Sequence, residues 1–558
     1  MKIKKCFKLW LVAIAMTGVT LSCSVEDDVS PTNPNFLNSS SVKLGKKLEN
    51  PYSVENMKKA WGNIHLTDAR TTRSDVTIQT THLYVKFTPK SEKELDILKN
   101  DKTLILYDYP LDYELEEAGT FYRDPLTPSD QPTPQYCAVQ VDYAFPQGVE
   151  YDILEELFIP DEDLNNSSGR LANDETISEL VTEALRITGN LTNENSVKSN
   201  GASNARTQAS SWRPAGRIRV WDESIGTTTT SRRVFSHWEY YDCGDGDLYG
   251  IESNPSVSLL IKPIEQCKRA IYKTIYDAIG GSYVPLIGAK VRARRWFTTY
   301  EGLTNSIGDF SCNGTFKRDA NYSIKWERND FDIRSGTFGQ ALYNGPKITG
   351  DWRLDIRSGA SRMYAIVHQA AFDYYYGNRL NLKSPPENSF WKTRVKFSVW
   401  DESNEDANGR HCKDCRFLGI FSQIKIWNNG GNFQAIYGTT IHELAHASHW
   451  ELRKNNWNDN NTDEIVKETW ARGVQWAIGN IRYTGYTPPY FGVYTGLVQD
   501  LIDPVDASGY DRVSFYSIKQ IEDVLSNTSN FINWENNLRN NYANSTESNL
   551  GPIFEFWN

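Results

Sequence analysis

The pentapeptide His442-Glu443-Leu444-Ala445-His446 restricts what the C-terminal third of this chain can fold into more than any other feature of the sequence. It lies inside the stretch 432–453, whose apolar side chains recur at helical spacing, so we expect one helix there. Two His residues four apart project from the same face of a helix and can reach one metal ion. The pattern therefore predicts a helix that packs with one stripe and binds metal with another.

A catalytic zinc ion usually has three protein ligands and leaves a fourth position for water. His449 lies about 10 Å along the helix axis from the first His of the pentapeptide, so we expect it to be packed rather than bound to the ion. The stretch 461–481 predicts the next helix, with Asn461 as its cap. Glu468, in an early turn of that helix, is free to face the metal.

Two motifs together, His-Glu-Leu-Ala-His at 442–446 and Glu-Thr-Trp-Ala at 468–471, resemble those of the gluzincin branch of zinc metallopeptidases. The resemblance covers roughly residues 360–558 and includes an expected helix over 361–376 and an expected strand over 421–427. In zincins, the edge strand ahead of the active-site helix pairs with extended substrate. The resemblance gives that role to the expected strand.

The same resemblance implies the site residues and the chemistry. His442, His446 and Glu468 are the implied ligands of Zn²⁺, and Glu443 is the implied general base. The implied reaction is hydrolysis of peptide bonds in a protein or peptide substrate by a metal-activated water, with Glu443 taking the proton and passing it to the leaving amine. The sequence contains no Gly-x-Ser-x-Gly elbow and no phosphate-binding loop that would favour another enzyme class.

Two departures from the family pattern concern the surroundings of the ion. Many gluzincins place an Asp four residues after the Glu ligand to hold the first His, and this chain has Arg472 there. Another group must therefore hold the first His, and Asp463 or a carbonyl group is the candidate. Thermolysin-like members of the family use a downstream His to stabilise the oxyanion, and no His follows His449 in this chain. The resemblance therefore implies that a Tyr takes this role, with Tyr490 and Tyr494 as the candidates.

The first 22 residues are predicted to be a signal peptide, with four Lys residues before a short apolar run. Thr-Leu-Ser-Cys at 20–23 resembles a bacterial lipoprotein signal, which implies acylation of Cys23, and the acidic residues that follow resemble those of surface lipoproteins of the Bacteroidota. We therefore expect a lipid-anchored protein of the outer membrane, exposed at the cell surface. An ordinary secretory signal followed by an incidental Cys is the alternative.

Cysteine usage fits an oxidising compartment. Beyond Cys6 and Cys23 the chain has six Cys residues, an even number that suits disulfide bonds outside the cytosol. His411, Cys412 and Cys415 offer three metal ligands in principle, but no second pair at finger spacing is present. A disulfide bond is therefore favoured over a metal site at this position.

A chain of 558 residues is too long for one core, and we predict a multidomain α+β protein. After a polar tether over 23–45 comes a β-rich N-terminal region over 46–210. It contains expected strands at 84–87, 104–107 and 139–141 and an expected helix over 175–188 that Gly189 ends. The Ser-, Asn- and Gly-rich segment 190–211 marks a domain boundary.

The middle domain, 211–340, is predicted to be a β-sandwich. Residues 281–335 resemble carboxypeptidase regulatory-like domains of transthyretin-like topology, which implies a supporting role for this domain. Residues 222–280 are then an insertion, with an expected helix over 264–279. The zincin-like metallopeptidase domain follows over 341–558.

Charge excludes one class of partner. The net charge is −10, and removing the four Lys residues of the signal makes it −14, so nucleic acid is not an expected partner.

The competing function is a catalytically weak or inactive zincin-fold lipoprotein that binds glycans or adheres to glycoproteins. Arg472 and the missing downstream His favour it, whereas the aromatic content of 13% is explained equally well by ordinary β-sandwich cores.

Overall fold

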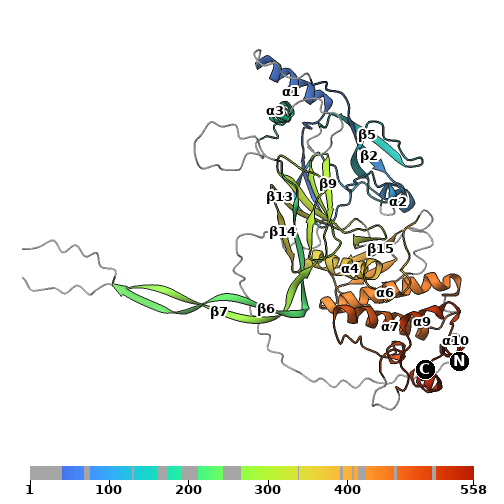
Figure 1. Cartoon of the computed structure of the whole chain (residues 1–558). Helices are drawn as coiled ribbons and strands as arrows, with labels where there is room; N and C mark the ends of the chain where they lie inside the picture. Colours follow the sequence, from blue (N-terminus) through green and yellow to red (C-terminus); the bar gives the residue numbers. More distant parts are fainter. Residues whose placement is uncertain are drawn as a thin grey trace, which may run out of the picture. The chain divides into compact units, whose positions relative to one another are not determined.

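The computed structural model shows a mixed α/β fold with several sheets along one chain (Figure 1), in agreement with the α+β prediction at this coarse level. The described residues are 41–67, 76–128, 131–160, 174–191, 211–242, 266–336, 339–389, 394–404, 407–412, 423–457, 461–504 and 511–558. The predicted signal peptide, Cys23 and most of the predicted tether lie outside them. None of the described helices is both long and apolar enough to cross a membrane.

The N-terminal region combines a three-stranded antiparallel sheet, in the order β4-β2-β5, with a two-stranded sheet of β1 and β3. Its elements are β1 (Lys43–Lys47), α1 (Val54–Thr67), β2 (His82–Thr88), α2 (Glu92–Asn100), β3 (Tyr113–Glu117), β4 (Gln135–Gln140), β5 (Glu150–Leu157) and α3 (Asp174–Ile187). Helices α1 and α3 pack against each other.

Most of the predicted elements of this region are present, with one exception. The strands expected at 84–87 and 139–141 correspond to β2 and β4, and the expected helix is α3, which ends before Gly189 at a φ of 72°. The strand expected at 104–107 is wrong. Only Tyr107 forms an isolated bridge there, because the chain turns at Asp101, whose carbonyl accepts from Leu104 N–H. Leu104, Leu106 and Tyr107 are buried although the stretch forms no strand.

Two sheets form the middle of the chain and share one hydrophobic core. The first has the order β10-β6-β14, with β7 paired to β6, and the second has the order β13-β11-β8-β9. The strands are β6 (Ala215–Asp242), β7 (Gln266–Pro285), β8 (Lys290–Arg295), β9 (Thr298–Leu303), β10 (Asp309–Ser311), β11 (Ala320–Lys325), β13 (Leu342–Ile348) and β14 (Trp352–Ile356). Val220 and Leu354 of one sheet and Ala293 and Ile324 of the other belong to that core.

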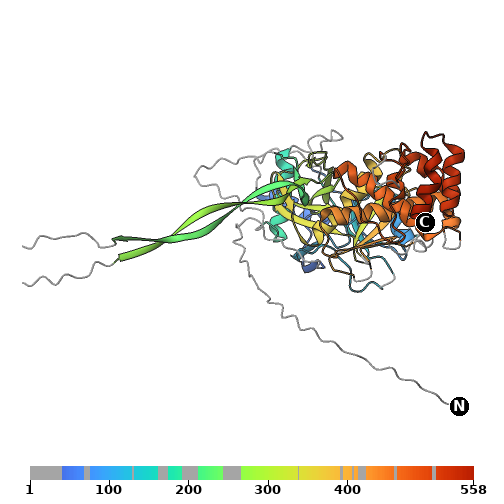
Figure 2. The same cartoon turned by 90° about the horizontal axis from the view of Figure 1, so that it is seen from below.

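The helix expected over 264–279 is wrong, because residues 266–279 are part of strand β7 and the first two residues lie outside the described part of the chain. Strand β7 pairs antiparallel with β6 over a long two-stranded ribbon that continues beyond the sheet (Figures 1 and 2). Ile271, Ile275 and Ile279 are four residues apart, a spacing that fits one face of a helix and equally one face of a strand. The β-branched and aromatic residues between them favour the strand once β6 is available as a partner.

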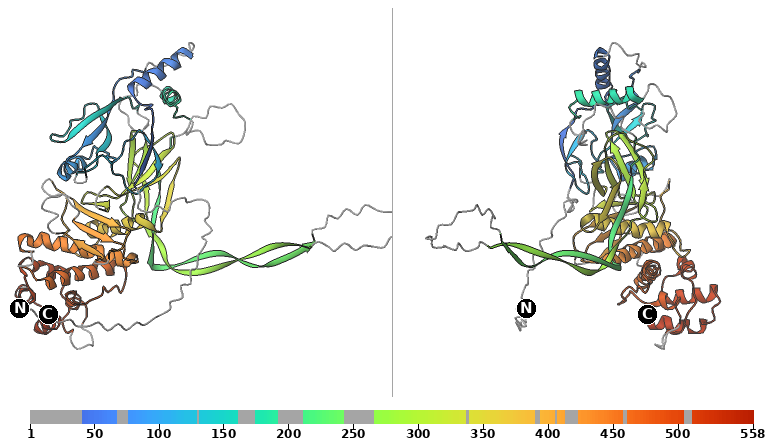
Figure 3. Two further views of the ribbon diagram at one scale, coloured as in Figure 1. Left: turned by 180° about the vertical axis from the view of Figure 1, so that it is seen from behind. Right: turned by 60° about the vertical axis from the view of Figure 1, so that its left-hand side comes forward.

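The C-terminal part contains a four-stranded sheet in the order β12-β15-β17-β16, in which only β16 is antiparallel. Its elements are β12 (Phe331–Ser335), α4 (Gly359–Tyr376), β15 (Val395–Trp400), β16 (Gly409–His411), β17 (Ile424–Trp427), α6 (Phe433–Arg453), α7 (Glu464–Arg482), α8 (Leu497–Asp500), α9 (Ile518–Asp523), α10 (Phe531–Asn541) and α11 (Leu550–Trp557). Helices α4 and α6 contact the sheet, and α7 packs along α6 (Figure 3).

The predicted helices of this part are confirmed as α4, α6 and α7, although α7 begins at Glu464 with Asp463 rather than Asn461 as its cap. The expected edge strand is corrected. β17 lies inside the sheet between β15 and β16, and the short strand β16 forms the edge on this side among the described strands. Strand β16 could not be predicted, because its three residues are too few to show a periodic pattern.

Residue 340, where the predicted middle domain ends, does not divide the strands into two separate groups. β12, which precedes that position, joins the sheet beside α6, and β14, which follows it, pairs parallel with β6 of the middle sheet. The chain therefore crosses from the middle sheets to the C-terminal sheet and back more than once. Contacts between β12 and β14 and their partners tie the middle of the chain to the part that carries the pentapeptide.

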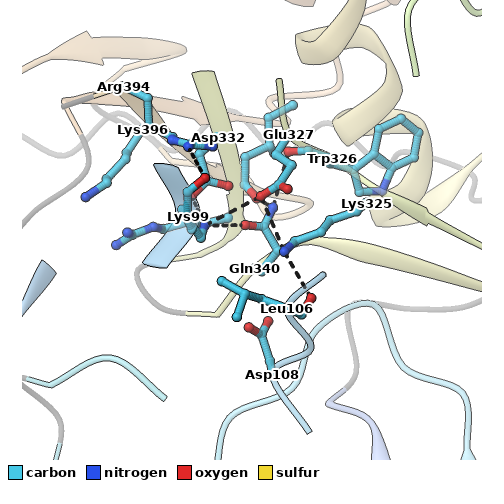
Figure 4. Close-up of polar contacts among 12 residues, drawn as sticks. Lys99, Leu106, Asp108, Lys325, Trp326, Glu327, Asp332, Gln340, Arg394 and Lys396 are labelled. Atoms are coloured by element: carbon cyan, nitrogen blue, oxygen red, sulfur yellow. Dashed lines mark hydrogen bonds and ion pairs between the residues drawn. The ribbon is translucent and has the colours of Figure 1, made fainter. Parts of the chain in front are cut away.

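Buried ion pairs connect α2 of the N-terminal region to this sheet, and the pair of Lys99 of α2 with Asp332 of β12 is drawn in Figure 4. Lys396 of β15 donates to Glu92 (2.9 Å) and to Asp96 (3.2 Å), and Arg334 of β12 donates to Glu92 (2.7 Å). Because side chains alternate along a strand, Lys396 faces α2 while its neighbour Phe397 lies in the core with α4. Helix α2 therefore covers the face of the sheet opposite to α4.

We expect Lys396→Met to lower the free energy of unfolding by about 3–5 kcal/mol, because removing one partner of a buried pair leaves the other charge uncompensated. The side chain of Lys396 is 0% exposed. Urea unfolding of the purified chain at pH 7 measures the effect. The matched control is Lys59→Met, whose pair with Glu55 is exposed and should contribute less than about 1 kcal/mol. Equal losses in the two variants would contradict a stabilising role for the buried network.

Acid should weaken the same network. Burial alone would raise the pKa of Glu92, but Arg334 and Lys396 hold it at about 2. A carboxyl group with a lowered pKa stabilises the fold above its unfolded pKa, near 4.5, and loses that contribution as the pH falls toward 2. The decrease in stability between pH 4.5 and pH 2 should therefore be smaller in Lys396→Met than in the wild type.

Candidate metal centre

Helices α6 and α7 position the predicted ligands. Helix α6 begins after Asn432, whose side chain accepts a hydrogen bond from the Ala435 N–H (2.9 Å). Ile441 and Leu444 of α6 and Trp470 of α7 are fully buried in the shared core. This packing fixes how the two helices rotate against each other. The remaining face of α6 carries the two His residues toward α7.

Three side-chain atoms meet at one point between the helices. Nε2 of His442 lies 3.0 Å from Oε2 of Glu468 and 3.1 Å from Nε2 of His446. Nε2 of His446 lies 3.2 Å from the same Glu468 oxygen. Ligand atoms bound at 2.0–2.1 Å to a tetrahedral zinc ion are separated by about 3.3 Å, close to these distances. Two imidazole nitrogens and one carboxylate oxygen are also a donor set that zinc accepts.

Electrostatics favour a cation at this point. Burial alone would raise the pKa of Glu468, but His446 and the hydrogen bonds with both imidazoles hold it far below its ordinary value. The carboxylate therefore remains charged at neutral pH. Within the described residues, the three side chains form one of two groups with donor atoms close enough to hold a metal ion, and His449 is not part of it.

The predicted general base lies beside the three ligands and is itself buried. Burial raises the pKa of Glu443 to about 7, and Glu468 adds to the increase, whereas His442 and a backbone hydrogen bond at His411 oppose it. A divalent cation held by the three ligands would lower this pKa, because a nearby positive charge favours the carboxylate.

The edge strand β16 approaches Glu443 closely because its first residue is Gly409. A Cβ atom at this position would lie 2.7 Å from Oε1 of Glu443 and 2.6 Å from Cγ2 of Thr439. Any larger residue must move either the strand or the carboxylate. Gly409 thus allows the backbone of the sheet edge to pass directly beside the predicted base.

We expect Gly409→Ala to lower peptide hydrolysis by about 10-fold with zinc content unchanged, because displacing a catalytic group by a fraction of an ångström already costs rate. Steady-state kinetics and metal analysis of the purified variant measure both quantities. Gly62→Ala is the control, since nothing lies within 4 Å of a Cβ at that helical position. It should leave activity unchanged and stabilise the chain by about 0.5–1 kcal/mol. Full activity in Gly409→Ala would show that the close approach has no catalytic role.

Of the two Tyr candidates, the structure brings Tyr494 to the ligands. Its ring lies 5.7 Å from the ring of His442, centroid to centroid. Burial and the nearby Glu468 and Glu443 carboxylates raise the pKa of Tyr494 to about 12, so the hydroxyl keeps its proton. Tyr490 instead contacts Trp557 (5.6 Å between ring centroids) and lies over the Arg472 guanidinium.

The residues around the ligands differ from the expected family pattern. Arg472 turns to the following loop, where it donates to the carbonyls of Pro488 (2.6 Å) and Pro489 (3.2 Å). Asp463 caps α7, and its backbone N–H donates to the Ser529 carbonyl (2.8 Å). In the described part of the chain, Nδ1 of His446 is buried without a hydrogen-bond partner.

Sequence reasoning considered His411 only as a partner of Cys412 and Cys415 and did not place it beside His446. It lies in β16, its ring centroid is 6.3 Å from that of His446, and it also contacts Trp457 at 5.5 Å. His449 is fully buried and lies against the same Trp457 at 6.2 Å. The sequence offered no signal for His411 beyond its place next to Cys412, because it is distant from the pentapeptide along the chain.

The cysteines are only partly paired. Cys412 is disulfide-bonded, as favoured from the sequence, whereas Cys415 lies outside the described residues. Cys137 and Cys312 are free and buried, so the even number of Cys residues does not mean that all of them form disulfide bonds. Burial raises the pKa of both thiols to about 12, so they remain protonated and unreactive.

Comparison of the chain with protein families finds no matching family model. Comparison with curated proteins and with solved structures finds no match either. The function proposed for the protein therefore depends on its own residues and on the geometry of the metal centre.

Proposed function

We propose that the protein is a surface-anchored, zinc-dependent metallopeptidase of gluzincin type. One observation carries the proposal: Nε2 of His442, Nε2 of His446 and Oε2 of Glu468 lie within 3.0–3.2 Å of one another. Glu443 is buried beside them, and the edge strand β16 passes next to it. Metal ligands, a base and a strand edge are the parts that peptide hydrolysis requires.

Each residue has a separate task in this proposal. Zn²⁺, when bound by the three ligands, polarises the scissile carbonyl and activates a water molecule. Glu443 takes the proton from the water and delivers it to the leaving amine. Tyr494 keeps its hydroxyl proton and donates a hydrogen bond toward the developing oxyanion. The backbone of β16 holds the extended substrate at the sheet edge.

Anchoring and domain roles belong to the same proposal. A lipid on Cys23 would hold the protein at the outer membrane, with the chain exposed to protein or peptide substrates outside the cell. The disulfide bond at Cys412 supports an oxidising compartment. The two middle sheets, which share one core, support a carboxypeptidase regulatory-like sandwich over about 211–340 that holds its neighbour in place.

The proposal is tested by removing and restoring the metal. Purified chain should contain one zinc ion per molecule, cleave members of a peptide library, lose this activity in a chelator and regain it when Zn²⁺ is added. Magnesium is the control ion, because it prefers an octahedral set of oxygen ligands and should not restore activity. A chain that binds no zinc after refilling would exclude the proposed function.

One observation favours the second candidate, a catalytically weak or inactive glycan-binding or adhesion lipoprotein. Nδ1 of His446 has no hydrogen-bond partner among the described residues, and such partners usually raise metal affinity and fix the imidazole. This candidate predicts bound zinc, no cleavage of any library peptide, and measurable binding to a glycan array. Cleavage that depends on zinc would reject it.

A further inference from the structure

Helix α7 holds the segment that follows it at several points, all within one turn of the ligand Glu468. The hydroxyl of Thr469 donates to the Val493 carbonyl (3.3 Å) and lies 2.9 Å from the hydroxyl of Thr495. The ring of Tyr494 lies 5.7 Å, centroid to centroid, from that of His442. The segment 488–495 is therefore fixed relative to the metal ligands by the helix that supplies one of them.

Arg472 makes the third of these attachments of α7 to the segment, one helical turn after Glu468. It is 1% exposed, and its guanidinium donates to the carbonyls of Pro488 and Pro489 at 2.6 and 3.2 Å. The same guanidinium lies 5.4 Å from the ring centroid of Tyr490. A planar cation with several donors is suited to holding two successive carbonyls, a task that Lys can perform only in part.

The held segment ends in a tight turn that presents an aromatic side chain. Phe491 and Tyr494 exchange two backbone hydrogen bonds, of 3.1 and 3.0 Å, and Gly492 between them has a φ of 55°. The Phe491 side chain is 66% exposed. Its ring centroid is 4.9 Å from that of Tyr494, which in turn contacts His442. An exposed aromatic ring on a fixed turn beside a metal centre is a surface for contact with a ligand.

We propose that Phe491 is a specificity-determining residue that receives a large apolar side chain of the peptide substrate near the scissile bond. In this proposal Arg472 is a positioning residue, which holds the 488–495 segment so that Phe491 faces the substrate. The inference deepens the proposed metallopeptidase function and rests on it. It also explains why α7 carries Arg at the position where the resemblance implied an Asp.

The substrate contact is tested by binding, in the Glu443→Gln chain so that no peptide is consumed. The probes are fluorophore-labelled, alanine-rich peptides that carry one Phe, one Leu or one Ser at the same position. We expect the Phe and Leu peptides to bind about 10-fold more tightly than the Ser peptide, a difference typical of one apolar pocket. Adding Phe491→Ala should remove most of this preference.

The matched control is Phe515→Ala, because Phe515 is also an exposed Phe, 75% accessible, outside the 488–495 segment. It should keep the preference unchanged. The inference is overturned if the three peptides bind equally to the starting chain, or if Phe491→Ala retains the full preference. Failure of the proposed function gives a different result: selective peptide binding by the wild type without zinc-dependent cleavage.

The positioning role is tested by amide hydrogen exchange in the metal-free chain. Arg472→Lys should raise the exchange rates of the Phe491 and Tyr494 amides at least 10-fold and leave zinc stoichiometry at the wild-type value. Arg453→Lys is the matched control, since Arg453 is also buried and donates to backbone carbonyls, those of Leu525 and Ser526. The role is overturned if the Phe491 and Tyr494 amides of Arg472→Lys exchange at the wild-type rate. It is also overturned if the variant loses zinc while these two amides remain protected from exchange.

Discussion

Glu443→Gln is expected to lower kcat/KM for peptide hydrolysis by about 100- to 10,000-fold, while the chain still binds one zinc ion. Gln has nearly the same shape as Glu but cannot accept a proton from water at neutral pH. Glu443 is buried beside the ligands without being one of them, so the donor set for zinc remains complete. Steady-state kinetics on a library peptide, with metal analysis of the same preparation, measures both quantities.

The control for this variant is Glu451→Gln, which makes the same chemical change on the same helix, two turns further on. It should retain nearly full activity. If Glu443→Gln cleaves peptides as fast as the wild type, another group acts as the base and the assignment is wrong. If it also loses zinc, its effect is on the metal centre and not on proton transfer.

Glu468→Ala should abolish stoichiometric zinc binding and, with it, hydrolysis. The variant removes the single oxygen that lies 3.0 and 3.2 Å from the two imidazole nitrogens, and two nitrogen ligands alone hold zinc poorly. In the wild type, zinc at about 1,000 times its dissociation constant should stabilise the fold by about 4 kcal/mol, because it binds only the folded chain. Thermal unfolding with and without zinc measures this difference.

The same measurement on Glu464→Ala provides the control, since Glu464 is an exposed Glu in the first turn of the same helix. Zinc should raise the melting temperature of Glu464→Ala as in the wild type and leave that of Glu468→Ala nearly unchanged. An equal zinc-dependent shift in both variants would remove Glu468 from the ligand set.

The helices around the metal centre could be predicted because their signals are local. The periodic apolar residues of 432–453 and 361–376, and the caps and spacing of 461–481, are properties of neighbouring residues, and the structure has α6, α4 and α7 at these places. The pairing of His442 with His446 follows from helix geometry alone. Glu468 lies near them because two packed helices bring their facing turns together.

Other elements depended on partners that are distant in sequence. Residues 266–279 form a strand because β6 pairs with them, although the spacing of their Ile residues fits a helix as well. Strand β16 is a strand only because β17 lies beside it, and its three residues have no preference of their own that could reveal it. The buried pairs of Lys396 with α2 likewise join positions about 300 residues apart.

The sequence by itself determined the helices of the candidate metal centre and the common face of His442 and His446, because a turn of helix sets those positions. Only the tertiary structure decided what surrounds them: Gly409 beside Glu443, Tyr494 rather than Tyr490 at His442, and Arg472 on the 488–489 carbonyls. These contacts arise between segments that no local periodicity relates. They are fixed by the packing of α6, α7 and the sheet, which is a property of the whole fold.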